Sequence, residues 1–255
     1  MTTLAINGLE IFFTDQGEGD ALILVHGFAA SSEENWAKAG WLSMLTRARR
    51  RVVALDLRGH GKSGKPHNPQ DYSIAAMAED VLALTEHLQL KKPDLIGFSL
   101  GARVVIEALR RRGERFLLGV LCGVGDFLVN PREGRDPEVG ARAMEAASAD
   151  EISDDMAKRF RLFAEAQGQD LKALAAVSRG LATTPPWTPA VLSQVKNETL
   201  IVAGSGDDLA GPPEPLARYF PNAKAKRIPG CGHMDCLTQP MFKAAVMDFL
   251  AGVPD

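Results

Sequence analysis

The chain has 255 residues, which suits one large domain or a core with a small inserted module. An apolar fraction of 45% and a charged fraction of 24% exclude disordered, collagen-like and coiled-coil chains, and the net charge of −3 argues against a nucleic-acid partner. Three cysteines are too few for a disulfide framework, no apolar run is long enough to span a bilayer, and no secretory signal is visible at the N-terminus. We therefore expect a cytoplasmic protein without a membrane span.

Along the chain, short apolar segments alternate with longer helical patterns. Residues 4–6 and 9–14 flank Asn7-Gly8, a pair that adopts the positive φ angles of a tight hairpin turn. Apolar residues at three- and four-residue spacing predict helices at 74–90 and 102–112. Continuous apolar runs, typical of strands buried on both faces, lie at 21–25, 52–57, 94–97, 117–122 and 200–203. This alternation predicts an α/β fold, with helices on both faces of a mostly parallel twisted sheet.

One stretch, residues 126–189, contains no buried-strand run. It has three helical patterns instead, at 137–147, 154–167 and 171–180, the first beginning with Pro137. A segment with three prolines, 183–189, then ends helical structure. We therefore predict a helical insertion at 126–189 in an α/β core made of residues 1–125 and 190–255.

The motif Gly97-Phe98-Ser99-Leu100-Gly101 joins a predicted strand to a predicted helix. In a nucleophile elbow of the form Gly-x-Ser-x-Gly, the serine lies on a strained strand-to-helix turn, and the two glycines let strand and helix approach closely. The serine hydroxyl then projects at the carboxyl edge of the sheet, above the positive end of the helix dipole. An N-cap serine at an ordinary junction is the alternative. The strand before Ser99 and the helix after it favour a nucleophile.

With four further motifs, the elbow makes the chain resemble α/β-hydrolases that carry a helical cap. The resemblance covers essentially the whole chain, and the five motifs follow one another in the order found in that family. The further motifs are His26-Gly27-Phe28, residues 56–64 (Asp-Leu-Arg-Gly-His-Gly-Lys-Ser-Gly), Gly204-Ser205-Gly206-Asp207 and Gly230-Cys231-Gly232-His233. The resemblance implies that the insertion at 126–189 is a cap over the nucleophile.

A serine hydroxyl needs a base to take its proton, and the base needs an acid partner. Of the five histidines in the chain, the resemblance places the base at His233, in the loop before the last helix. The Gly-x-x-Asp pattern of the family places the acid at Asp207. Asp126, after the strand at 117–122, is the rival acid, because some members of the family draw their acid from that edge. The resulting chain order is Ser99, Asp207, His233, as this fold requires.

An oxyanion formed at the nucleophile needs backbone N–H donors. The residue after the nucleophile, Leu100, supplies one, and the resemblance implies that Phe28 supplies the other. Apolar cap side chains are candidates for the substrate pocket, although residues at helical spacing also form the core of a cap. The candidate lining residues are Phe127, Phe160, Phe163, Trp187 and Met234. They favour a small, moderately apolar, uncharged substrate.

Two other patterns suggest cofactor or metal sites, and both are incomplete. Residues 59–64 form Gly-x-Gly-x-x-Gly after a strand, but Lys65-Pro66 follows where a dinucleotide site needs the first turns of a helix. Cys231-x-His233-x-x-Cys236 offers three ligands to a metal, with no second cluster to complete a tetrahedral site. We therefore expect neither a cofactor nor a metal.

The sequence thus predicts a serine hydrolase that cleaves a carboxylic ester or a related acyl bond of a small molecule. A hydrolase of carbon–carbon bonds in vinylogous diketones, a lactonase and a cofactor-free perhydrolase share the fold and the triad, so the motifs do not separate them. A ligand-binding or signalling member of the fold is an alternative of another class, although a binder has no chemical need for a complete triad. The sequence leaves open whether the protein is a monomer or a homodimer.

Overall fold

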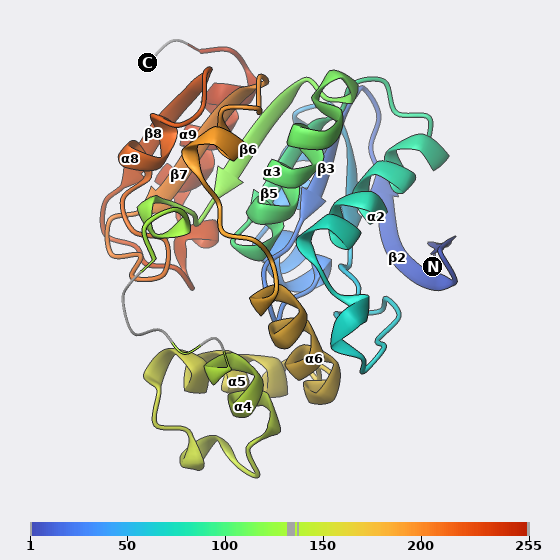
Figure 1. The fold of residues 1–255 in the computed structure, drawn as a ribbon. Coiled ribbons are helices and arrows are strands. Elements are labelled where there is room, and N and C mark those ends of the chain that lie inside the picture. The colour runs from blue at the N-terminus through green and yellow to red at the C-terminus, as the bar shows by residue number, and fades with distance from the viewer. Residues whose placement is uncertain (1, 132–135, 137, 254–255) are drawn as a thin grey trace.

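The computed structural model describes residues 2–131, 136 and 138–253. Its strands form one eight-stranded sheet in the order β1-β2-β4-β3-β5-β6-β7-β8 (Figure 1). The strands are β1 (Thr2–Ile6), β2 (Leu9–Gln16), β3 (Asp20–Val25), β4 (Arg50–Leu55), β5 (Asp94–Phe98), β6 (Leu118–Cys122), β7 (Glu198–Gly204) and β8 (Ala223–Ile228). The pairs β1–β2 and β2–β4 are antiparallel and the other five pairs are parallel, so the predicted fold class is confirmed.

The sheet begins with the predicted hairpin. Ile6 pairs with Leu9, and the turn between them has positive φ at both Asn7 (50°) and Gly8 (81°). Farther along, side chains alternate between the two faces of the sheet, as the period of a strand requires. In β3, for example, Ile23 and Leu24 contribute to different hydrophobic clusters.

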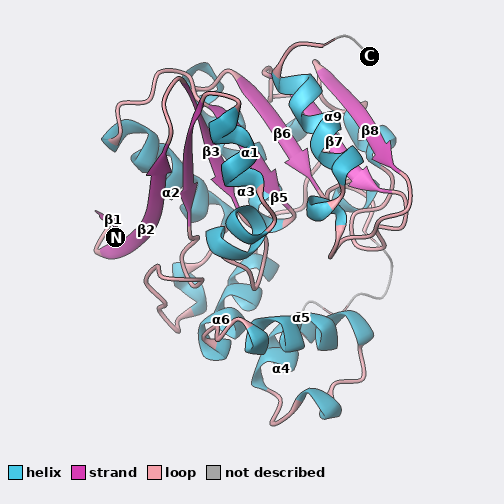
Figure 2. Ribbon diagram, turned by 180° about the vertical axis from the view of Figure 1, so that it is seen from behind, coloured by secondary structure: helices cyan, strands magenta, loops and turns pink. Residues whose placement is uncertain are grey.

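Helices cover both faces of the sheet. The helices α2 (Ile74–His87), α3 (Leu100–Arg112) and α8 (Pro213–Ala217) contribute to the cluster on one face. The helices α1 (Trp41–Arg47) and α9 (Pro240–Leu250) contribute to the cluster on the other face, the nearer one in Figure 2. The predicted helix at 74–90 is shorter than expected, because Gln89 takes a positive φ of 50° that a helix cannot contain.

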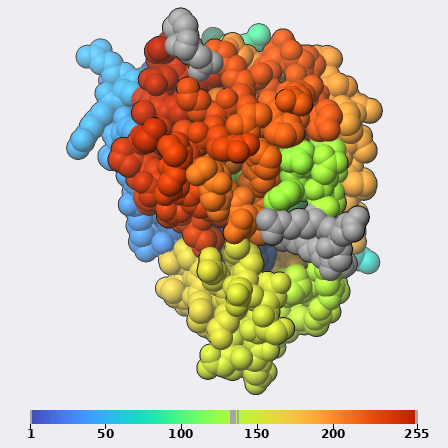
Figure 3. Space-filling view, turned by 90° about the vertical axis from the view of Figure 1, so that its left-hand side faces the viewer, coloured from blue at the N-terminus to red at the C-terminus, as the bar shows by residue number. Residues whose placement is uncertain are grey.

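Three helices, α4 (Val139–Glu145), α5 (Asp155–Ala166) and α6 (Leu171–Ala182), lie beyond the carboxyl ends of the parallel strands (Figures 1 and 2). In the space-filling view they form a lobe beneath the C-terminal part of the chain (Figure 3). The short helix α7 (Pro189–Leu192) then leads back to the sheet. Pro137, where the sequence predicts the first of these helices to begin, lies outside the described residues. The division into a core and a cap at residues 126 and 189 stays a prediction.

The start of α5 and the start of α6 are both capped by aspartate. The side chain of Asp154 accepts the N–H of Ala157, and that of Asp170 accepts the N–H of Ala173. Arg161, on α5, is buried and donates to backbone carbonyls at the end of α4. Its guanidinium therefore serves the packing of α4 against α5. No helix in the described part of the chain is both long and apolar enough to cross a membrane.

Candidate active site

Ser99 lies between the end of β5 and the first residue of α3, in a backbone conformation with φ 54° and ψ −110°. Positive φ is strained for a residue with a side chain, and such strain is typical of functional sites. The two glycines of the motif are needed for space. A Cβ atom on Gly97 would lie 2.3 Å from the carbonyl oxygen of Gly101, and one on Gly101 would lie 2.0 Å from the carbonyl oxygen of Val25. The local structure therefore has the geometry expected of a nucleophile elbow.

The fold brings Ser99, His233 and Asp207 into one hydrogen-bonded chain. Nε2 of His233 lies 2.9 Å from Oγ of Ser99, and Nδ1 lies 2.9 Å from Oδ2 and 3.0 Å from Oδ1 of Asp207. All three residues follow carboxyl ends of strands, with Ser99 after β5, Asp207 after β7 and His233 after β8. Both partners of the His233–Asp207 pair are buried, so water weakens this contact little.

The structure pairs His233 with Asp207 and not with the rival, Asp126. Oδ1 of Asp207 also accepts the backbone N–H groups of Leu209 and Ala210, which hold the carboxylate in place. Asp126 begins a short 3₁₀ helix, and its Oδ1 accepts a hydrogen bond from Nδ2 of Asn130 at 2.9 Å.

The two N–H groups expected to hold an oxyanion have no acceptor among the described residues. Leu100 is the first residue of α3, so no carbonyl of that helix can accept its N–H. Phe28 follows His26-Gly27 in the loop after β3, and Ala29 beside it has a positive φ of 60°. Two backbone donors without an acceptor, one of them on the residue directly after the strained Ser99, are what oxyanion stabilisation needs.

The residues at 20–166 match a family model described as alpha/beta hydrolase fold. The chain belongs to this family. It is 31% identical over 256 residues, 88% of each chain, to a protein of Synechocystis sp. named "Putative non-heme chloroperoxidase". It is also similar to the structure of a thermophilic esterase from Thermogutta terrifontis, with a TM-score of 0.77 and 26% identity over 99% of this chain and 97% of the other.

Similarity extends to the structure of an enol-lactonase from Burkholderia xenovorans LB400, with a TM-score of 0.78 and 23% identity over 98% of this chain and all of the other. At that identity the likeness shows the fold alone. The expectation from the sequence that this chain is a hydrolase of the α/β-hydrolase fold is confirmed.

One aromatic contact of this hydrolase is not predictable from the sequence. The ring of Phe98, directly before Ser99, lies with its centroid 5.0 Å from that of His233 and an interplanar angle of 33°. Gly123 makes room for it, because a Cβ atom there would lie 2.6 Å from the Phe98 ring. Phe98 occupies the position between the first glycine and the serine of Gly-x-Ser-x-Gly. Any residue is allowed there, so the motif carries no signal for this contact.

Among the described residues, the other four histidines make no hydrogen bond to Ser99. His26 accepts the N–H of Leu57 at Nε2, and burial lowers the pKa of His26. His60 lies edge-on to His26, and burial lowers the pKa of His60 to about 3. Both rings are therefore neutral at physiological pH. His67 faces Asp170, and His87 is exposed on α2.

The five candidate lining residues lie in different surroundings. Phe160 contacts Phe28 with ring centroids 5.7 Å apart, and Phe163 packs against the small cluster among α4, α5 and α6. Trp187 is buried in the main core, and Met234 is 45% exposed. The ring of Phe127 lies beside Gly211. Their role in binding substrate stays a prediction.

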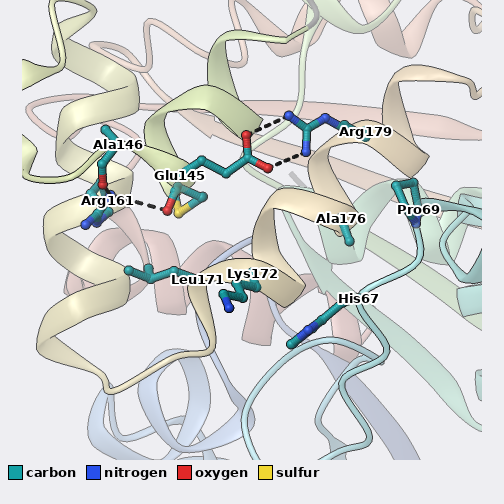
Figure 4. Close-up of a pocket in the computed structure, with 10 residues that line it drawn as sticks. His67, Pro69, Glu145, Ala146, Arg161, Leu171, Lys172, Ala176 and Arg179 are labelled. Carbon is teal, nitrogen blue, oxygen red and sulfur yellow. Dashed lines mark hydrogen bonds and ion pairs between the residues drawn. The ribbon is translucent and has the colours of Figure 1, made fainter.

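Two hollows have walls that contain none of Ser99, His233 and Asp207. The first, of about 530 Å³, lies between the helical lobe and the loop at 67–69, and its Arg179 faces the carboxylate of Glu145 (Figure 4). Arg161 in its wall is bound to backbone carbonyls. The second, of about 600 Å³, is lined by Asp56 and Gln169 among others.

Cys231 and Cys236 flank His233 in the sequence, and both are packed in the protein interior. Both thiols are buried and directed at backbone carbonyls, that of Ile228 and that of His233. Burial raises the pKa of both thiols, so neither is a ready thiolate ligand. Within residues 2–131, 136 and 138–253, no group of three or more potential metal-ligating side chains is close enough to hold an ion.

Proposed function

We propose that this hydrolase cleaves carboxylic esters, or related acyl bonds, of small and moderately apolar molecules through a Ser-His-Asp triad and an acyl-enzyme. The observation that carries the proposal is the chain of contacts from Asp207 through His233 to Ser99, with 2.9 Å between Nε2 of His233 and Oγ of Ser99. That distance suits proton transfer from the hydroxyl to the imidazole. The strained φ of Ser99 supports the same role.

In the first half of the proposed reaction, Oγ of Ser99 attacks the substrate carbonyl as Nε2 of His233 takes the hydroxyl proton. The carbonyl oxygen becomes an oxyanion that accepts the N–H groups of Phe28 and Leu100. Asp207 accepts the Nδ1–H of His233, which keeps Nε2 free to accept and stabilises the imidazolium that forms. The imidazolium then donates its proton to the alcohol oxygen, and the C–O bond breaks.

Water completes the cycle. His233 takes a proton from a water molecule as its oxygen attacks the acyl carbon, and the same two N–H groups hold the second oxyanion. The bond to Oγ of Ser99 breaks, and the proton on His233 returns to Oγ. The products are a carboxylic acid and an alcohol, and the route uses no cofactor or metal.

The preference for an apolar substrate is inferred from the aromatic side chains next to the proposed oxyanion site. Phe28 and Phe160 contact each other there, and Phe28 carries one of the two N–H donors. Arg161, the buried cation directly after Phe160 in the chain, is bound to carbonyls at the end of α4. A substrate without a charge near the acyl carbon fits this composition.

The test is turnover of p-nitrophenyl esters from acetyl to decanoyl, with Ser99→Ala as the matched variant. We expect ester hydrolysis by the wild type and a loss of roughly 10³–10⁶-fold in kcat for Ser99→Ala. The optimum acyl length reports the depth of the site. An absence of turnover on every ester in the series contradicts the proposal and favours the carbon–carbon hydrolase or the binding protein.

A further inference from the structure

Gln169 connects the helical lobe to two loops: the first follows β3 and contains Ala30, and the second follows β4 and contains Gly61. It lies in the turn between α5 and α6, and its side-chain amide makes two hydrogen bonds across the boundary. Nε2 donates to the carbonyl oxygen of Ala30 at 3.0 Å, and Oε1 accepts the N–H of Gly61 at 3.0 Å. The orientation of the amide is set by these partners, because a carbonyl only accepts and an N–H only donates.

The Ala30 carbonyl belongs to the loop that carries Phe28. On the other side of Phe28, the N–H of Gly27 donates to Oδ1 of Asn35 at 2.8 Å. The loop is therefore held at one residue before Phe28 by Asn35 and at two residues after it by Gln169. Between these points Ala29 has a positive φ of 60°, a strained conformation that persists only when its surroundings hold it.

The side chain of Phe28 is held as well. Its ring lies edge-on to His60, with centroids 5.8 Å apart, and to Phe160 of α5, 5.7 Å away. Phe160 and Gln169 both come from the helical lobe, one from α5 and one from the turn after it. The lobe thus contacts this short loop through the ring of Phe28 and through the backbone two residues later.

The second loop is tied to the first independently of Gln169. Oδ1 of buried Asp56 accepts the N–H of Ser32, and Oδ2 accepts the N–H of Lys62. The neighbour of Lys62, Gly61, donates to Gln169. The Asp56 carboxylate therefore holds the two loops together, and Gln169 links the helical lobe to both of them.

From these contacts we propose that Gln169 is a positioning residue, which fixes the Phe28 N–H for oxyanion stabilisation and so makes the rate of chemistry depend on docking of the helical lobe. This inference rests on the proposed function, since it concerns the oxyanion of that reaction. Gln169 does not touch the reacting atoms. It acts through the Ala30 carbonyl, and a shift of about 1 Å in a group that acts on the reaction can cost on the order of 10²-fold in rate.

The decisive variants are Gln169→Ala, which removes both hydrogen bonds, and Gln169→Glu, which keeps an acceptor for the Gly61 N–H but has no donor for the Ala30 carbonyl. Gln167→Ala is the matched control. It removes the same side chain two residues earlier in the same turn, where the described residues offer the Gln167 side chain no hydrogen-bond partner.

Each variant is titrated with a fluorophosphonate that labels Ser99, so that kcat is expressed per active site and a poorly folded fraction does not count. We expect both Gln169 variants to lose about tenfold to 10²-fold in kcat with KM within about threefold of wild type, and Gln167→Ala to retain kcat. The inhibition constant of an aryl trifluoromethyl ketone, whose adduct with Ser99 places an oxyanion in the same site, should rise by the factor by which kcat/KM falls.

Other outcomes overturn the inference. A kcat per active site within twofold of Gln167→Ala for both Gln169 variants means that the contact only stabilises the fold. A change confined to KM means that Gln169 acts on substrate entry. If Gln169→Ala does not fold, Gln169→Glu decides alone. If the wild type neither hydrolyses esters nor takes the fluorophosphonate label, the proposed function fails first, which separates that failure from this one.

Discussion

Replacement of Asp207 by Asn tests how the carboxylate acts on His233. Oδ1 of Asp207 accepts the N–H groups of Leu209 and Ala210 at 3.1 and 2.9 Å. In the variant the amide oxygen takes this place, because an NH₂ group cannot accept those hydrogen bonds. The NH₂ group then takes the place of Oδ2, which lies 2.9 Å from Nδ1 of His233.

An NH₂ group facing Nδ1 forces the imidazole proton onto Nε2, the atom that must accept the proton of Ser99. We expect kcat to fall by about 10⁴-fold, the scale that the wrong tautomer costs a triad of this kind. The variant has nearly the same shape, so its fold should survive, and far-UV circular dichroism checks this.

The matched control for the acid is Asp126→Asn. Its carboxylate accepts from Asn130 and makes no hydrogen bond to His233 among the described residues. We expect kcat of this variant to lie within about twofold of wild type on the same p-nitrophenyl ester. If Asp207→Asn keeps more than about a tenth of the wild-type kcat, or if Asp126→Asn shows the large loss, Asp207 is not the acid partner of His233.

Two further predictions concern stability. Gly101→Ala should lower the free energy of unfolding by about 1–3 kcal/mol or more, because its Cβ would lie 2.0 Å from the Val25 carbonyl oxygen. In the control Gly206→Ala the Cβ would lie 3.4 Å from the nearest atom, so the loss measured by urea titration should be smaller. Equal losses would contradict this reasoning. His60 is buried with a pKa of about 3, so the unfolded state binds a proton that the folded state does not, and stability falls as pH drops below about 6.5 towards 3. Between pH 7 and pH 5 the protonation of His60 in the unfolded state should lower the free energy of unfolding by about 2 kcal/mol. His60→Asn should remove this part of the pH dependence, and His87→Asn, at an exposed position, should not. Equal pH dependence of the wild type and both variants would contradict the prediction.

The parts of this structure that the sequence predicted are those whose determinants lie close together in the chain. The hairpin depends on Asn7-Gly8, and the elbow depends on Gly97 and Gly101 around Ser99, so a few consecutive residues carry the whole argument. The buried strands were predicted for the same reason, since each run is apolar along its length. The end of the helix at 74–87 was missed because Gln89 adopts positive φ without being glycine.

Local sequence patterns did not predict contacts between residues that are far apart in the chain. His233 lies 134 residues from Ser99, and physical patterns alone do not rank one loop histidine above another. Only the resemblance to a family singled out His233 and Asp207. Phe98 against His233 and Gln169 against Ala30 had no signal at all, because an aromatic ring or an amide finds its partner only when the chain has folded.

Covalent labelling shows directly whether Ser99 is the nucleophile. The protein is incubated with a fluorophosphonate, its mass is compared with that of Ser99→Ala treated in the same way, and the modified peptide is sequenced by mass spectrometry. We expect one adduct per chain, on Ser99, and none on the variant. An unlabelled wild type, or an adduct on another residue that persists in Ser99→Ala, would contradict it.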